Sequence, residues 1–106
     1  MKNLLVAMLC LALVNGVDIQ KLADAIKLAE NSETFPYGVK SVKCSGEAEC
    51  RQVCINSIKN NLRRYEASDK STDFITFMGK RWCPPKEHRL NKNWVKNVKY
   101  YYHKQE

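Results

Sequence analysis

Glu30 is the residue of this 106-residue sequence whose position best suits acid–base chemistry. It ends an apolar helical pattern, four residues after Ile26, and the turn of residues 31–38 (Asn-Ser-Glu-Thr-Phe-Pro-Tyr-Gly) begins directly after it. A carboxyl group at the margin of a core and beside a cleft stays protonated near neutral pH, because burial disfavours its charged form. A solvated glutamate gains little at a helix C-terminus, where the helix dipole opposes negative charge. We therefore predict that Glu30 is a general acid.

A helix has to position Glu30, and residues 18–31 carry the pattern of one. Apolar residues recur there at steps of three and four, and Asp18 suits the N-cap or the first turn. Pro36 stops the helix, and the alternation from Val39 to Lys43 indicates a short extended segment. We expect at most a minor strand or β-hairpin, near residues 38–44.

Three further helices are predicted in the rest of the chain. The second follows Ser45 as its N-cap, and its apolar side includes two cysteines. The third is capped by Ser71 or Thr72 and ends at Trp82, because two prolines follow shortly after. The fourth begins near Asn91 and carries aromatic residues at helical spacing. The sequence thus predicts a small, mainly helical domain.

Residues 1–16 have the composition of a secretory signal peptide. Lys2 provides the positive start, the following apolar run is too short to span a bilayer, and small residues precede Val17. We expect a single domain of residues 17–106, a monomer that is secreted or exported to the periplasm and has no membrane span after cleavage. An uncleaved membrane anchor is the alternative.

The mature chain is strongly basic. Without the single cation of the leader, 17 basic residues stand against 11 acidic ones, a net charge of +6. Such a charge attracts polyanions, of which an exported chain meets acidic cell-wall polymers and anionic lipids far more than nucleic acid. We therefore predict a cell-wall partner and no nucleic acid. The alternative is that the cations only keep the domain soluble.

Four cysteines follow the leader, and an even number in a small secreted domain indicates two disulfides. Three pairings are possible, and the sequence does not select one. We favour Cys44 with Cys50, which closes a short loop at a helix entrance, and Cys54 with Cys83, which ties distant segments together. Zinc is the alternative use, but the spacings lack the paired C-x2-C knuckles of zinc sites. We predict no metal and no cofactor.

Two segments resemble the active-site region of lysozyme-like enzymes. Residues 25–32 (Ala-Ile-Lys-Leu-Ala-Glu-Asn-Ser) and 37–41 (Tyr-Gly-Val-Lys-Ser) resemble the helix, acid and Tyr-Gly turn of lytic transglycosylases and goose-type lysozymes. Residues 73–84 and 93–98 look like the C-terminal half of small phage and bacterial proteins of this kind. The resemblance implies a small lysozyme-like helical domain that cleaves the glycosidic bonds of peptidoglycan, with Glu30 as acid and base.

The number of carboxylates distinguishes two reactions. A single acid can protonate the leaving glycosidic oxygen and then act as base on the sugar's own 6-hydroxyl, which leaves an anhydro product. Hydrolysis with two carboxylates needs a partner acid. Glu33 lies next to a turn and Asp18 lies at the opposite end of the helix, so neither is an obvious partner. The sequence therefore favours lytic transglycosylation over hydrolysis.

Aromatic and amide side chains are the candidates for holding a sugar. Aromatic rings stack on sugar faces, and amides bond hydroxyl and acetamide groups. Most aromatic residues here keep helical spacing and so belong to a core, whereas Tyr37 lies on the turn. The predicted substrate-binding residues are Tyr37, Gly38, Ser41, Asn60, Trp94 and Asn97.

A non-catalytic role is the second hypothesis. In that case the chain is a secreted cationic module that binds the cell wall or interacts with another protein, and Glu30 is a peripheral acid. Neither His88 nor His103 has a companion at ligand spacing, so both are interpreted as solvated. The basic residues that would then matter are Arg51, Lys59, Arg63, Arg64, Lys80 and Arg81.

Overall fold

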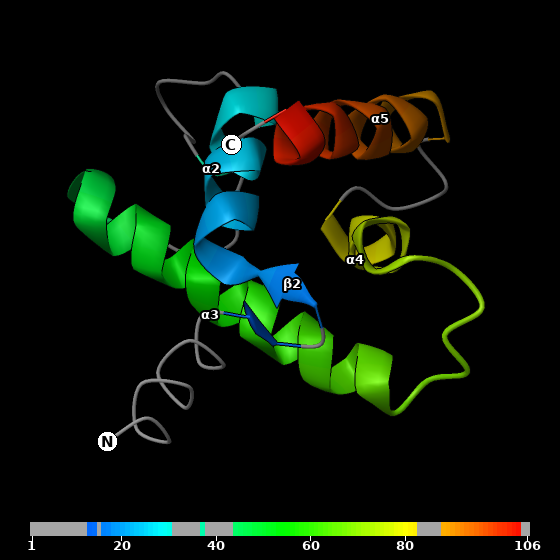
Figure 1. Ribbon diagram of the computed structural model, residues 1–106. Coiled ribbons are helices and arrows are strands. Elements are labelled where there is room, and N and C mark those ends of the chain that lie inside the picture. Colours follow the sequence, from blue (N-terminus) through cyan, green and yellow to red (C-terminus); the bar gives the residue numbers. More distant parts are fainter. Residues whose placement is uncertain (1–12, 15, 31–36, 38–43, 83–87, 105–106) are drawn as a thin grey trace, which may run out of the picture.

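The computed structural model describes residues 13–14, 16–30, 37, 44–82 and 88–104, and it is mainly helical, as predicted. Four helices account for most of the described chain (Figure 1): α2 (Ile19–Glu30), α3 (Gly46–Glu66), α4 (Phe74–Trp82) and α5 (His88–Lys104). No helix among the described residues is both long and apolar enough to cross a lipid bilayer.

Two short strands precede the helices. Strand β1 (Leu13–Val14) pairs antiparallel with β2 (Val17–Asp18), and Val14 lies opposite Val17. Gly16 at the turn has φ +77°, a left-handed conformation that glycine adopts without steric cost. This pairing lies at the predicted leader boundary and was not expected. The strand or hairpin predicted near residues 38–44 falls almost entirely outside the described residues and stays a prediction.

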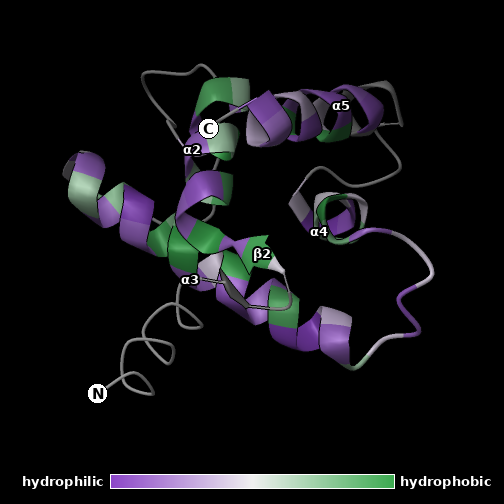
Figure 2. Cartoon of the chain, viewed as in Figure 1, coloured by the Kyte–Doolittle hydropathy of each residue, from purple (hydrophilic) through white to green (hydrophobic). Residues whose placement is uncertain are grey.

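Helix α2 is the centre of the helical arrangement. It contacts both α3 and α5, and α4 contacts these same two helices from another side (Figure 1). Five apolar residues of α2 are buried, whereas many residues of α5 are hydrophilic (Figure 2). Amphipathic helices of this kind are held together mainly by burial of their apolar stripes. The buried apolar side chains are Ile19, Leu22, Ala23, Ala25, Ile26, Tyr37, Cys50, Cys54, Ile55, Ile58, Leu62, Phe74, Ile75, Met78, Trp94 and Val98.

Local hydrogen bonds explain where the helices begin. The Asp18 carboxylate accepts a hydrogen bond from the Lys21 N–H at 3.1 Å, which confirms Asp18 as the N-cap of α2. At α4 the cap is Asp73, whose carboxylate accepts the Thr76 N–H at 3.1 Å. The prediction of Ser71 or Thr72 as this cap is therefore wrong. A carboxylate directly before the first helical residue reaches the third N–H, which the two preceding hydroxyls do not.

The cysteines follow only one of the two predicted pairings. Cys44 and Cys50 form a disulfide with a Cα–Cα distance of 5.2 Å, at the entrance of α3 as predicted. Cys54 is a free, fully buried thiol, so the structure does not form the expected bond at Cys54, and Cys83 lies outside the described residues. Burial raises the pKa of the Cys54 thiol to about 12. Because disulfide exchange requires a thiolate, this core position is chemically unreactive.

Candidate functional site

Glu30 is the last residue of α2, half-buried, at the place where this helix meets α5. Its Oε1 accepts a hydrogen bond from Nε1 of Trp94 at 2.9 Å, across 64 positions of sequence. The bond fixes the orientation of the carboxyl group relative to the core. We call Glu30, Trp94 and the neighbouring Trp82 the acid site.

The indole of Trp94 is itself held on two sides. It is only 8 % exposed, and its ring stacks on Trp82 with a centroid distance of 5.8 Å and an interplanar angle of 23°. Gly79 of α4 packs against Trp94 and Val95 of α5. A Cβ atom added at Gly79 would come within 3.3 Å of the Trp94 ring and 2.8 Å of Val95 Cγ2. The absence of a side chain at Gly79 therefore lets α4 and α5 approach closely.

Trp82 carries an unusual polar atom. Its Nε1 is buried and finds no hydrogen-bond partner among the described residues. Leaving a buried N–H unpaired costs about 1–3 kcal/mol, so such groups are rare in folded proteins. Its ring is next to the indole that binds the Glu30 carboxyl, so two aromatic rings make this side of the acid site apolar.

A second polar cluster joins α2 to α3, and we call it the α2–α3 clamp. The Tyr37 hydroxyl donates to Glu47 Oε1 at 2.6 Å, and Lys27 Nζ donates to the same oxygen at 2.9 Å. Arg51 donates to Asp24 Oδ1 at 2.6 Å and, through its other nitrogen, to the side-chain oxygen of Gln20 at 2.9 Å. The clamp consists of Gln20, Asp24, Lys27, Tyr37, Glu47 and Arg51.

The clamp contacts shift the pKa values of Glu47 and Tyr37. The hydrogen bonds from Tyr37 and then Lys27 lower the pKa of the Glu47 carboxyl, because both favour the charged form. Burial, followed by the hydrogen bond to Glu47, raises the pKa of the Tyr37 hydroxyl above its ordinary value of 10.0. Glu47 is thus an ionised structural acid, and sequence patterns gave no sign of it beyond its place in the first turn of α3.

The structure places the predicted sugar-binding residue Tyr37 in the core. This side chain is 1 % exposed and belongs to the core, with its hydroxyl engaged in the clamp. A sugar needs an open aromatic face, and this ring offers none. Trp94 is also buried, and its N–H is bonded to Glu30, a contact that the sequence did not predict.

The remaining predicted substrate residues are not gathered at the acid. Asn60 is exposed on α3, where it accepts a hydrogen bond from Arg63, and Asn97 is exposed on α5. Neither has a described contact with Glu30. Gly38 and Ser41 lie outside the described residues, so their predicted roles stay predictions.

Two hollows of the described surface are lined by residues other than Glu30. One, of about 340 Å³, lies between the start of α2, the start of α4 and the end of α5, and includes Leu22, Phe74 and Tyr102 in its lining. The other, of about 490 Å³, is a shallow depression on α5. Within the part of the chain that the structure describes, no three His, Cys, Asp or Glu side chains are grouped to hold a metal.

The chain was compared with known proteins at three levels. No protein-family model, no curated protein and no solved structure matches it.

Proposed function

We propose that this protein is an exported, peptidoglycan-cleaving glycosidase in which Glu30 is the general acid and base. The observation that carries the proposal is the hydrogen bond of 2.9 Å that holds the half-buried Glu30 carboxyl on the Trp94 indole. General acid catalysis needs a carboxyl group that is held still and partly removed from water. The resemblance of residues 25–41 to lytic transglycosylases and goose-type lysozymes supports the same role.

The proposed reaction uses one carboxyl group twice. In its protonated form, Glu30 donates a proton to the glycosidic oxygen as the bond to the sugar's C1 breaks. The resulting carboxylate then takes the proton of the same sugar's 6-hydroxyl, whose oxygen attacks C1 and closes an anhydro ring. Glu30 ends the cycle protonated, as it began. This sequence of steps requires no second protein carboxylate.

Substitution of Glu30 tests the proposal directly. Glu30→Gln keeps a carbonyl oxygen that accepts the Trp94 N–H but removes the titrating proton, so we expect cleavage of isolated sacculi to fall about 10²–10⁴-fold, the usual contribution of general acid–base catalysis. Glu47→Gln is the matched control, because it neutralises a carboxylate of the clamp and should leave cleavage within about twofold. Equal activity of wild type and Glu30→Gln would falsify the catalytic assignment.

The products separate the two chemistries. Mass spectrometry of digested sacculi should detect anhydro ends if the 6-hydroxyl is the nucleophile, whereas reducing ends would mean hydrolysis by water. Reducing ends would keep Glu30 as an acid but would contradict the single-carboxylate mechanism. If wild-type protein releases no fragments, the proposal that it is a glycosidase is contradicted.

A cationic binding module is the second candidate. It is favoured by the burial of Tyr37, whose ring offers no open face to a sugar. Arg51 does not serve such a role, because its guanidinium is bonded within the clamp. Binding of intact protein to sacculi with steep salt dependence, together with no released fragments, would favour this candidate.

A further inference from the structure

Helix α5 carries positive charge without any acidic residue. Between His88 and Lys104 the sequence contains one arginine, four lysines and two histidines, and neither Asp nor Glu. Side chains three, four and seven residues apart share one side of a helix. We call the set that lies along the outer side of α5 the basic stripe: Lys92, Lys96, Lys99, Tyr100, His103 and Lys104.

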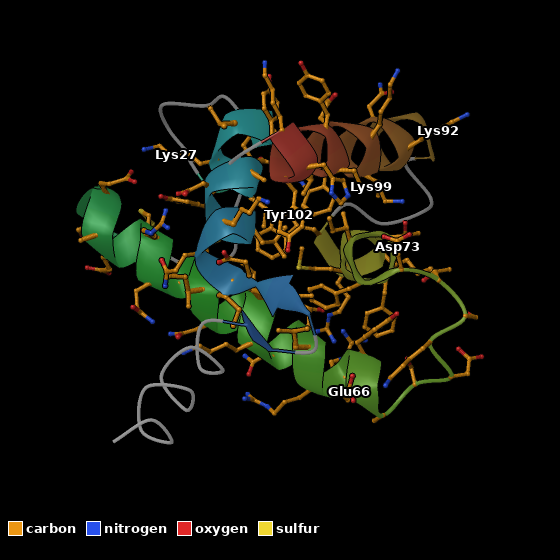
Figure 3. The ribbon with its side chains drawn as sticks, in the orientation of Figure 1. Lys27, Glu66, Asp73, Lys92, Lys99 and Tyr102 are labelled. Atoms are coloured by element: carbon orange, nitrogen blue, oxygen red, sulfur yellow. A yellow bond between two sulfur atoms is a disulfide. The ribbon has the colours of Figure 1, made fainter. Side chains whose placement is uncertain are left out.

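The residues of the basic stripe are exposed except Lys99, which is half-buried. A shallow hollow of about 490 Å³ is lined by its last five members. Tyr100 is 57 % exposed, and Lys104 Nζ donates to its hydroxyl at 3.2 Å. Figure 3 shows Lys92 pointing away from the molecule at one end of α5, whereas Lys99 points toward Asp73. From Lys92 to Lys104 the stripe extends about 18 Å along the helix.

Most of this charge is not neutralised within the described chain. Lys99 pairs with Asp73 at 2.9 Å. Among the described residues, Lys92, Lys96 and Lys104 take part in no ion pair. Like charges on one helix face repel one another, and a polyanion laid along the face removes that repulsion. The stripe is therefore suited to a negatively charged chain.

The composition of the stripe limits the chemical class of anion that it suits. A lysine ammonium is a compact point charge, whereas arginine makes the planar, two-pronged contact typical of specific phosphate recognition. Widely spaced single charges thus suit the stripe better than a dense phosphate backbone. Tyr100 and Leu28 are the exposed large apolar side chains of the described residues, and Leu28 belongs to α2, so the stripe lacks the apolar face of a membrane-bound helix.

We propose that the basic stripe of α5 docks the protein on the peptide carboxylates of peptidoglycan. This inference rests on the proposed function, because it assigns the same polymer to a second surface, distinct from the acid site. The stripe binds single carboxylates spaced along the wall, and the ring of Tyr100 lies against the sugar or peptide between them. Docking concentrates the enzyme on its insoluble substrate without taking part in bond cleavage.

Co-sedimentation with isolated sacculi tests the docking. The triple variant Lys92→Gln/Lys96→Gln/Lys104→Gln should bind at least tenfold more weakly than wild type in about 0.1 M salt, where exposed charges still interact over about 10 Å. The matched control Lys59→Gln/Lys80→Gln/Arg81→Gln removes the same charge from α3 and α4 and should bind within about twofold of wild type. Circular dichroism checks that both variants retain their helices.

The nature of the anion is tested by changing the sacculi. Converting their carboxylates to neutral amides should abolish binding of wild type. Binding that survives this treatment, equal weakening of both triple variants, or tighter binding to single-stranded DNA or to anionic phospholipid vesicles would each overturn the proposal. Fluorescence titration with these two probes measures the last comparison.

These experiments distinguish a failure of the docking proposal from a failure of the glycosidase proposal. Glu30→Gln should bind sacculi like wild type, while the stripe variant should cleave short soluble glycan fragments at the wild-type rate. Inactive wild-type protein that still binds through the stripe would remove only the glycosidase proposal. If the protein is active but the stripe variant binds sacculi as tightly as wild type, only the docking proposal is contradicted.

Discussion

Helix α2 presents a carboxylate to each of two neighbours, and the two contacts differ in kind. Toward α3, Asp24 pairs with Arg51 at 2.6 Å, and Glu47 of α3 receives Lys27 at 2.9 Å. Toward α5, Glu30 is bonded by the neutral indole of Trp94. Arg51 and Lys27 place a positive charge beside the clamp acids, whereas the indole of Trp94 orients the Glu30 carboxyl group without itself adding a positive charge. The described contacts of Asp24 and Glu30 thus differ in the charge of the donor.

Replacing Trp94 should produce the largest effect on this comparison. Trp94→Ala removes a buried ring that stacks on Trp82 and is expected to lower the free energy of unfolding by about 3–5 kcal/mol. Trp94→Phe keeps most of the ring but not the N–H, and should cost about 1 kcal/mol while lowering cleavage. Thermal or chemical denaturation measures the stability change, and Asn97→Ala on the same helix is the control.

A double-mutant cycle shows whether the Trp94 bond acts through Glu30. Trp94→Phe and Glu30→Gln should be non-additive in cleavage, because the first substitution acts by misplacing the group that the second removes. Additive losses would mean that Trp94 contributes to activity by another route.

The close contact behind the acid site predicts a smaller effect. Gly79→Ala gains about 1 kcal/mol of helix propensity but forces a methyl group to within 2.8 Å of Val95 Cγ2. Overpacking costs about 1–3 kcal/mol, so we expect a net destabilisation of about 1 kcal/mol and a shift in tryptophan fluorescence. A variant that is more stable than wild type would mean that Val95 rotates away and that the contact does not constrain Trp94.

Tyr37→Phe tests the clamp, and its expected loss of stability is similar to that of Gly79→Ala or smaller. The ring stays in the core, but the hydroxyl bonded to Glu47 is lost, at about 1 kcal/mol. The raised pKa of Tyr37 stabilises the folded protein below the ordinary value of 10.0, and this contribution disappears as pH rises through the higher folded pKa. Melting curves from pH 8 to 11 should therefore converge for wild type and variant. Cleavage near pH 7 should change little, unlike that of Trp94→Phe.

Features set by neighbouring residues could be predicted from the sequence. The Asp18 cap, the apolar stripe of α2 and the short Cys44–Cys50 loop all depend on residues within one or two helical turns. The cap of α4 was predicted one or two residues too early, because three successive capping side chains compete there and local pattern does not choose among them. Helix prediction therefore succeeded better than boundary prediction.

Contacts between distant segments were not predictable in the same way. Glu30 was selected by its place at a helix end, but its partner Trp94 lies 64 positions away and had been assigned to sugar stacking. Tyr37 was placed on a turn, and a turn residue can still turn its ring into the core, as this one does. The basic stripe was not predicted, because the spacing of the aromatic residues of α5 indicates only the buried side of this helix. Sequence periodicity predicts which face of a helix is buried, whereas the element that packs against this face depends on the fold.

Glu47→Gln should have the smallest effect, and its pH dependence identifies the clamp as electrostatic. Glu47 is about half exposed, so solvent and salt screen its interactions with Tyr37 and Lys27. Because its pKa is lowered in the folded state, its stabilisation is present above the ordinary value of 4.5 and is lost as pH falls through the lower folded value. The melting temperatures of wild type and Glu47→Gln should therefore differ most at neutral pH and become equal in strong acid. A difference that persists there would mean that Glu47 acts through packing, and the contrast with Glu30 would no longer rest on charge.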